Sequence, residues 1–284
     1  MESNDLVIRW VAESPAEQLA FRQCVHTLLM AIAHDPFLRS HMILKGGILM
    51  ALRYRSPRFT TDLDFSSQDH LADVRPETVS ETLGSSLAMM VAQLDYGLDC
   101  RVQGIRVQPA DSPEYRFPNI ELKIAYAYRG SPGHKRLTQG RGTQILTIDF
   151  NLNEPILAVE ELKIDGGSFE AYALTDLISE KLRSLLQQVL RHRNRRQDIF
   201  DVAQLLKHPI SEEQKKVILD SLKTKANSRA FEPLPTSFSD PELRERAEKE
   251  YHTLSDEMAG DLPDFDVIFR EVREFYESLP WNAF

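Results

Sequence analysis

The chain has 284 residues, of which 42% are hydrophobic and 27% are charged, as in an ordinary soluble globular protein. This length can bury a large core, as one domain or as two smaller ones. No apolar run approaches the length of a membrane span, and the acidic N-terminus lacks the order of a signal peptide. The only two cysteines, Cys24 and Cys100, are too few for a disulfide framework or a zinc site, so we expect a cytoplasmic protein with reduced thiols.

The formal net charge of −9 argues at first against a nucleic-acid partner. Its distribution weakens that objection, because residues 240–284 alone carry 13 acidic and 5 basic side chains. The preceding 239 residues hold 29 basic and 30 acidic side chains and are therefore nearly neutral. This larger part of the chain can still present a basic surface to an anionic partner.

The first predicted element is an amphipathic helix that ends near residue 34. Ser14-Pro15-Ala16-Glu17 has the form of a capping box with proline at the first helical position, and apolar residues then recur at helical spacing. A short strand is expected over residues 40–45 and a short helix over residues 48–54. The pair Gly46-Gly47 lies between them, where glycines let backbone amides and a helix N-terminus approach phosphate oxygens closely.

Two aspartates follow on a strand predicted over residues 61–66. If this segment is extended, Asp62 and Asp64 leave one face of the strand, and Leu63 and Phe65 leave the other. Two neighbouring carboxylates repel each other unless a cation lies between them, and hard oxygen ligands suit Mg²⁺. Together with the glycine pair, this stretch predicts a site for a triphosphate and a metal ion.

One helix and three strands come next. The helix is expected over residues 77–94, and alternating apolar residues indicate half-buried strands over residues 98–107, 120–128 and 144–150. The glycines and proline of residues 129–142 predict a mobile loop between the last two strands. Its basic residues either contact phosphate or are only solvated; they are Arg129, Lys135, Arg136 and Arg141.

The strand over residues 144–150 contains an unexpected acid. Asp149 lies between Ile148 and Phe150, and an acid inside such an apolar strand needs a functional reason, because burying an unpaired charge is costly. The preceding strand carries a second acid, Glu121.

A lysine interrupts the next apolar pattern. Lys181 falls within an apolar helical stripe that begins at residue 174. A lysine in this position either extends its ammonium group to solvent along the helix surface or directs it into a cleft toward an anion. The stripe alone favours the first alternative.

Downstream of this helix lie a basic run and a pair of aspartates. Arg191-His-Arg-Asn-Arg-Arg196 is the densest basic patch in the chain, either simply solvated or in contact with phosphate. Asp198 and Asp201 follow, three positions apart, and the simplest role of Asp198 is to cap a helix. The remaining chain is helical, then proline-rich, then helical and acidic, and it shows no catalytic pattern. It is either a supporting region or a partner-binding surface.

Two blocks together resemble the AbiEii/AbiGii toxin family, found in bacterial abortive-infection and toxin–antitoxin systems, within the polymerase-β-like nucleotidyltransferases. The first block is Lys45-Gly-Gly with Arg58-Phe-Thr-Thr-Asp-Leu-Asp-Phe65, since the superfamily signature is a glycine pair followed by Asp-x-Asp. The second is Glu180-Lys-Leu-Arg with Arg196-Gln-Asp-Ile-Phe-Asp-Val. It departs from the family at Gln197, where a basic residue is commoner, and Arg193, Arg195 and Arg196 are the candidates to supply that charge.

The resemblance implies an α/β (α+β) fold. A nucleotidyltransferase core with a mixed sheet would occupy residues 1–173, and a mostly helical domain carrying the second block would occupy residues 174–284. It also implies a third carboxylate on a strand beside the Asp-x-Asp strand; Asp149 is the candidate and Glu121 the alternative.

The resemblance assigns roles to individual residues. Asp62, Asp64 and Asp149 would hold Mg²⁺, and Asp198 would hold Lys181 or an arginine in the catalytic site. The nucleotide-binding residues would be Lys45, Gly46, Gly47, Arg58, Thr60 and Lys181. A contribution to RNA binding is expected from Arg191, Arg193, Arg195 and Arg196.

The implied activity is transfer of nucleotides from a nucleoside triphosphate to the 3′ end of tRNA, which would block translation. A cognate antitoxin would be the partner, and no membrane is expected. Two other interpretations stay open: transfer to a protein or small-molecule hydroxyl, and a catalytically degenerate module that only binds RNA or protein.

Overall fold

The computed structural model describes residues 6–109 and 116–282. The acidic residues 1–5, where no signal peptide was expected, lie outside the described part. By its contacts the chain divides into two compact units. The first consists of Met1–Arg53, Thr61–Glu154 and Glu160–Ala171, and the second of Tyr54–Thr60, Pro155–Val159 and Tyr172–Phe284.

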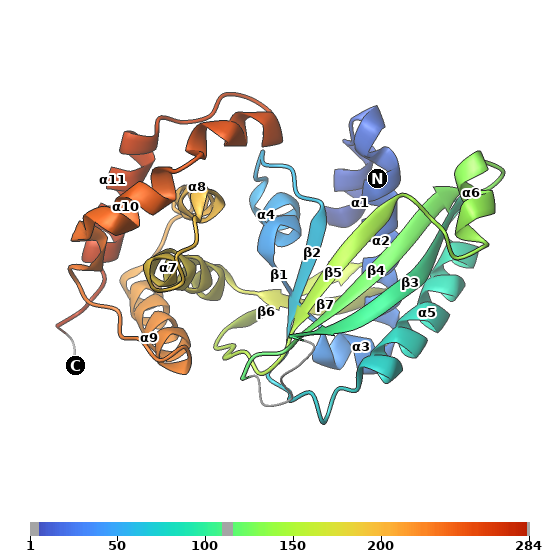
Figure 1. The fold of residues 1–284 in the computed structure, drawn as a ribbon, viewed down its shortest axis with the longest axis horizontal. Coiled ribbons are helices and arrows are strands. Elements are labelled where there is room, and N and C mark those ends of the chain that lie inside the picture. The colour runs from blue at the N-terminus through green and yellow to red at the C-terminus, as the bar shows by residue number, and fades with distance from the viewer. Residues whose placement is uncertain (1–5, 110–115, 283–284) are drawn as a thin grey trace. The chain divides into compact units, whose positions relative to one another are not determined.

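The described residues form a seven-stranded mixed sheet in the order β3-β4-β5-β2-β1-β7-β6 (Figure 1). The strands are β1 (Ile43–Lys45), β2 (Asp62–Ser66), β3 (Leu98–Gln108), β4 (Asn119–Tyr128), β5 (Ile145–Asn151), β6 (Val159–Ile164) and β7 (Gly167–Tyr172). This sheet confirms the predicted α/β class and the predicted strands β2 to β5. Strands β6 and β7 were not predicted. In β6, whose sequence is Val-Glu-Glu-Leu-Lys-Ile, charged residues interrupt the alternation of apolar and polar residues.

Helices cover one face of the sheet in the first unit. The helices of this unit are α1 (Leu6–Ala12), α2 (Leu19–His34), α3 (Pro36–His41), α4 (Gly46–Tyr54), α5 (Pro76–Gln93) and α6 (Pro132–Leu137). Figure 1 shows α2 behind the strands and α5 alongside β3; α2 contacts β3, β4 and β5, and α5 contacts β3. Leu63, Phe65, Leu122, Ile148 and Phe150 are fully buried, as expected for the core-facing positions of their strands. The alternate positions therefore belong to the opposite face.

The N-terminal prediction needs two corrections. Helix α2 begins only at Leu19, after a single 3₁₀ turn, and Ser14 does not cap it, because its hydroxyl donates to the carbonyl oxygen of Pro15. The strand expected over residues 40–45 is confirmed only as β1 (Ile43–Lys45), because residues 40 and 41 belong to α3 (Pro36–His41). The carboxylate of Asp35 accepts a hydrogen bond from the backbone N–H of Leu38, and Pro36 occupies the first helical position, so a true N-cap was overlooked there.

The segment 129–142 is not a loop throughout, so the predicted loop is wrong for its central residues. Residues 132–137 form α6, and Ser131 caps this helix by accepting a hydrogen bond from the backbone N–H of His134. Leu137 is buried against Ala125 and Ala127 of β4. The apolar contact anchors a segment whose glycines and proline had suggested only flexibility.

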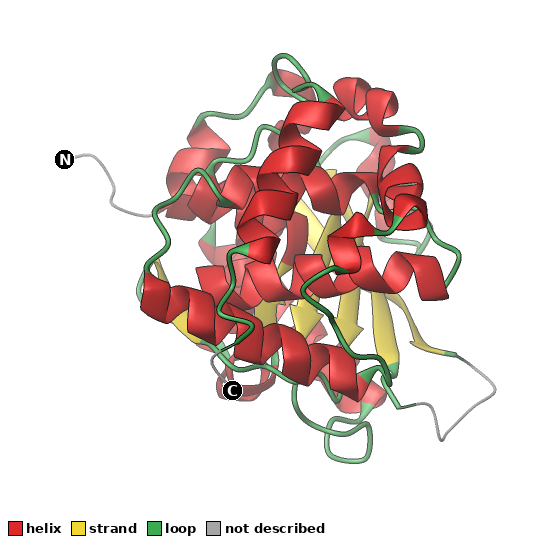
Figure 2. Cartoon of the chain, turned by 90° about the vertical axis from the view of Figure 1, so that its left-hand side faces the viewer, coloured by secondary structure: helices red, strands yellow, loops and turns green. Residues whose placement is uncertain are grey.

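The second unit is mostly helical, as predicted (Figure 2). Its helices are α7 (Leu174–Leu190), α8 (Arg196–Leu205), α9 (Glu212–Ser228), α10 (Pro241–Glu248) and α11 (Phe265–Glu277). Helix α7 contacts α8, α9 and α10, and its apolar residues Ile178, Leu182 and Leu185 are fully buried. Within the two described ranges, every helix is too short or too polar to cross a membrane.

Candidate active site

Acidic side chains from three neighbouring strands occupy one row of the sheet. Strands β2 and β5 are parallel, and their register places Asp64 beside Asp149. Strand β4 is antiparallel to β5 and places Glu121 beside Asp149, while β1 places Lys45 beside Asp64. Residues in register on adjacent strands share a face, so these side chains lie on the face opposite the apolar core. We call Asp62, Asp64, Asp149 and Glu121 the acidic row, since Asp62 shares the face of Asp64.

Gly46 is essential to this arrangement for a reason that the sequence did not reveal. Its φ is +72°, and a Cβ atom added to it would lie 2.0 Å from Oδ2 of Asp64. The carboxylate of Asp64 therefore occupies the space that a side chain would need. The glycine was predicted to admit phosphate, whereas the group found against it is Asp64. Gly47 is buried in the first turn of α4, and Lys45 is 6% exposed.

The two candidates for the third carboxylate have different surroundings. Oδ1 of Asp149 accepts a hydrogen bond from the side-chain amide of Asn119 at 2.6 Å. Oε2 of Glu121 accepts from the guanidinium of Arg106 at 2.6 Å and from the amide of Gln108 at 3.1 Å. Glu121 already has a positive partner and lies one strand farther from Asp64. The arrangement therefore favours Asp149, and its role as a metal ligand stays a prediction.

The acidic row also shifts a protonation equilibrium. The pKa of Asp62 is raised above its ordinary value, first by partial burial and then by the negative charges of Asp149 and Glu121. A cation near these carboxylates would relieve that repulsion.

The donor groups suit a divalent metal ion, although they are not drawn together around one. Across residues 6–109 and 116–282, no three His, Cys, Asp or Glu side chains are clustered as a ready-made metal site. Asp62, Asp64 and Asp149 nevertheless project from one face of adjacent strands. Carboxylate oxygens are the hard ligands that Mg²⁺ prefers. The residues present therefore fit the predicted ion.

The second unit contains a separate cluster of two cations and two anions: Arg58, Lys181, Asp198 and Asp201. The ammonium nitrogen of Lys181 lies 2.9 Å from Oδ1 of Asp198 and 2.8 Å from Oδ2 of Asp201. Arg58 donates to both carboxylate oxygens of Asp201, at 3.2 and 3.1 Å. The side chain of Asp201 is 0% exposed and that of Lys181 13%. We call these four residues the charged cluster.

The charges of the cluster stabilise one another. Burial alone would lower the pKa of Lys181, but Asp198 and Asp201 together raise it above its ordinary value. Burial alone would raise the pKa of Asp201, yet the charges of Lys181 and Arg58 lower it. Lys181 is therefore a permanent cation at physiological pH. Its ammonium group does not extend along the helix surface to solvent, and Asp198 holds Lys181 instead of capping α8 with its side chain.

Arg193, Arg195 and Arg196 were expected to supply the positive charge that is missing at Gln197. The cation that binds Asp201 is none of these three. Arg58, far away in sequence, binds Asp201. Arg195 approaches Asp198 at 3.7 Å, while Arg196 donates to Glu257 at 2.9 Å.

The other predicted residues are placed as follows. Arg191 and Arg193 are exposed, Arg195 is partly exposed, and Thr60 is partly exposed in the same segment as Arg58. Sequence reasoning missed Asn119. The available signal was its position two residues before Glu121, which puts both on the face of the acidic row.

Comparisons with known proteins define the family. Residues 27–277 match the family described as the nucleotidyl transferase AbiEii toxin of type IV toxin–antitoxin systems. No curated protein matches the sequence. Among solved structures, JHP933 from Helicobacter pylori is similar over 93% of this chain and 92% of its own, with 17% identity and a TM-score of 0.52. A second H. pylori protein is similar over 94% of this chain and 96% of its own, with 16% identity and a TM-score of 0.50.

The nucleotidyltransferase toxin MenT4 (Rv2826c) from Mycobacterium tuberculosis H37Rv is similar over 96% of this chain and 98% of its own, at 17% identity and a TM-score of 0.49. At such identities the likeness to the two H. pylori structures establishes a shared fold, whereas the family match extends over most of the chain. The chain belongs to the AbiEii family of nucleotidyltransferase toxins, of type IV toxin–antitoxin systems.

Proposed function

We propose that this toxin is a Mg²⁺-dependent enzyme that transfers a nucleotidyl group from a nucleoside triphosphate to an RNA hydroxyl, with Asp62, Asp64 and Asp149 as the metal ligands. The observation that carries the proposal is the register of β2 and β5, which puts Asp64 and Asp149 side by side on the face that also bears Asp62. The raised pKa of Asp62 supports it, because crowded carboxylates attract a cation.

In the proposed reaction a nucleotidyl group passes to the acceptor oxygen, and Asp149 of the acidic row takes up the acceptor proton. The acceptor oxygen bonds to the α-phosphorus, the bond from that phosphorus to the β-phosphate oxygen breaks, and pyrophosphate leaves with the electron pair. The acceptor proton passes to the carboxylate of Asp149, which the amide of Asn119 keeps in a fixed orientation. Bound Mg²⁺ would supply charge neutralisation and polarise the phosphoryl oxygens.

Lys181 is proposed to bind phosphate in the second unit. Asp198 and Asp201 hold its ammonium group and keep it protonated, as a phosphate-binding cation must be. Lys181→Met should therefore weaken nucleotide binding, measured by calorimetry on the folded variant. Lys225→Met is the matched control, because Lys225 is another buried lysine of this unit that binds a carboxylate, that of Asp176, at 3.0 Å. Equal nucleotide affinity in both variants would limit Lys181 to a structural role.

The proposed acceptor is the 3′ end of tRNA, and a cognate antitoxin is the expected partner. The exposed Arg191 and Arg193, with the partly exposed Arg195, could neutralise backbone phosphates. The exposed Lys135 and Arg136 of α6, and Arg141 after it, could do the same. Each such contact releases counterions, so binding to RNA should weaken as salt rises.

Incubation of the protein with each labelled nucleoside triphosphate, Mg²⁺ and total RNA tests the proposal. The expected result is label at tRNA 3′ ends. Label on protein or on a small molecule, with none on RNA, would replace the acceptor while leaving the transferase activity. RNA binding without any labelled product would instead indicate a degenerate binding module.

A further inference from the structure

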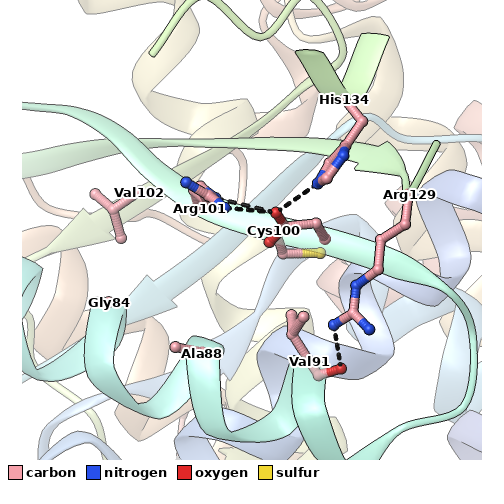
Figure 3. A pocket seen from close by; sticks show the side chains of 9 residues that line it. Gly84, Ala88, Val91, Cys100, Arg101, Val102, Arg129 and His134 are labelled. Atoms are coloured by element: carbon pink, nitrogen blue, oxygen red, sulfur yellow. Dashed lines mark hydrogen bonds and ion pairs between the residues drawn. The ribbon is translucent and has the colours of Figure 1, made fainter. Parts of the chain in front are cut away.

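The first unit contains a cavity of about 570 Å³ that the proposed reaction does not use. It lies along β3, with α5 as one wall and residues from the region of α6 above it (Figure 3). Strand β3 is the edge strand of the sheet, three positions from β2 in the strand order, so the cavity is separate from the Asp-x-Asp strand. Its volume falls within the range of small-molecule sites, roughly 300–1,000 Å³.

The wall formed by α5 is made of small side chains where larger ones would fit. Figure 3 shows Gly84, Ala88 and Val91 in succession along this helix. A glycine inside a helix costs about 1 kcal/mol relative to alanine, so its presence usually has a packing reason. Gly84 has none, because an added Cβ would meet its nearest neighbour, Cγ2 of Val102, only at 3.9 Å. Gly84 therefore leaves open space between α5 and Val102 of β3.

The opposite side of the cavity is rich in cationic groups. Arg101 and His134 both contact the carboxylate of Asp99, at 2.9 and 3.0 Å respectively. Arg129 donates one hydrogen bond to the carbonyl oxygen of Val91, at 3.2 Å. Two guanidinium groups thus line the cavity beside a single carboxylate, so the lining carries a net positive charge even when the histidine is neutral. A guanidinium has five N–H donors, and these contacts leave donors of both arginines for a ligand.

We propose that this cavity is a binding site for a small anionic molecule in which a phosphate or carboxylate group is joined to an apolar body. Arg101 and Arg129 bind the anionic group through charge-assisted hydrogen bonds. The apolar body packs against Val102 and Ala88, in the space left open at Gly84. This site is independent of the proposed transfer reaction.

Calorimetry with phenyl phosphate and with benzoate tests the proposal and distinguishes the two anionic groups. Benzyl alcohol is the uncharged control, and it should bind about tenfold more weakly or not at all. Gly84→Leu fills the cavity and Arg101→Gln removes one cation, and each should weaken binding at least about tenfold. The melting temperature of each variant checks that it is folded.

Two further variants serve as matched controls. Lys163→Gln removes an exposed cation of β6 that does not line the cavity, and Met89→Leu changes an exposed residue of α5; neither should alter binding. Weaker binding in either folded cavity variant supports the site. The proposal is overturned if neither anion binds to the wild-type protein, or if both anions bind Gly84→Leu and Arg101→Gln as tightly as the wild type.

Discussion

The acidic row and the charged cluster are built from the same kinds of residue but have opposite electrostatic character. In the acidic row, carboxylates lie beside carboxylates, and repulsion contributes to the raised pKa of Asp62. In the charged cluster, two aspartates are balanced by Lys181 and Arg58, and the pKa of Asp201 is lowered. The repulsion in the acidic row lowers the stability of the fold, and this row is expected to bind a cation. The charged cluster holds its own cations in place.

The largest expected effect is the loss of transfer when the acidic row is neutralised. Asp62→Asn or Asp64→Asn should lower the rate by at least about 10²–10³-fold, because a group that stabilises charge at the reacting phosphate is lost. Folding should be preserved, since the change also relieves repulsion. Glu121→Gln is the control in the same row and should retain most of the activity. Near-wild-type rates in the aspartate variants would refute the assignment.

Replacing an aspartate of the charged cluster with asparagine should instead lower the stability of the fold. Asp201→Asn removes a fully buried carboxylate from two mostly buried cations, and breaking a buried ion pair costs roughly 3–5 kcal/mol of unfolding free energy. Urea denaturation measures it. Asp266→Asn removes the exposed partner of Arg244 and should change stability by less than about 1 kcal/mol. Equal effects in the two variants would show that the cluster contributes no more than a surface pair.

A smaller effect is expected from Asn119, which touches the acidic row without belonging to it. Asn119→Ala frees the Asp149 carboxylate and should weaken metal affinity about 10–100-fold, as for other residues that orient a metal ligand. Gln108→Ala, which removes a contact to Glu121, is the matched control and should leave metal affinity unchanged. Similar losses in both variants would mean that Asn119 has no special relation to Asp149.

The smallest expected effect is a change in folding stability as the pH falls, and it has opposite signs in the acidic row and the charged cluster. The folded-state pKa of Asp201 is lowered, so its stabilising contribution is present above an unfolded-state pKa of about 3.9 and is lost as the pH falls below that value. The folded-state pKa of Asp62 is raised, so its cost at neutral pH is relieved as the pH falls through that raised pKa. Denaturation measured against pH should therefore show Asp201→Asn less stable and Asp62→Asn more stable than the wild type at neutral pH, with both differences shrinking as the pH falls. Differences of the same sign in the two variants would contradict the comparison.

Local sequence patterns predicted the elements that carry the site but not the contacts within it. Alternation placed Asp62 and Asp64 on one strand face, and helical spacing placed Lys181 on α7. The partner of Asp201 could not be found in this way, because Arg58 lies 143 residues away and only the tertiary fold brings them together. The approach of Asp64 to Gly46 depends likewise on the pairing of β1 with β2.

Manganese binding, followed by electron paramagnetic resonance in the presence of a non-hydrolysable nucleoside triphosphate, tests the central claim most directly. The wild-type protein should bind Mn²⁺, and Asp64→Asn should bind it at least about tenfold more weakly while remaining folded, because a carboxylate ligand is lost. Glu121→Gln should bind it as the wild type does. Unchanged affinity in Asp64→Asn would contradict the assignment of the acidic row as the metal site.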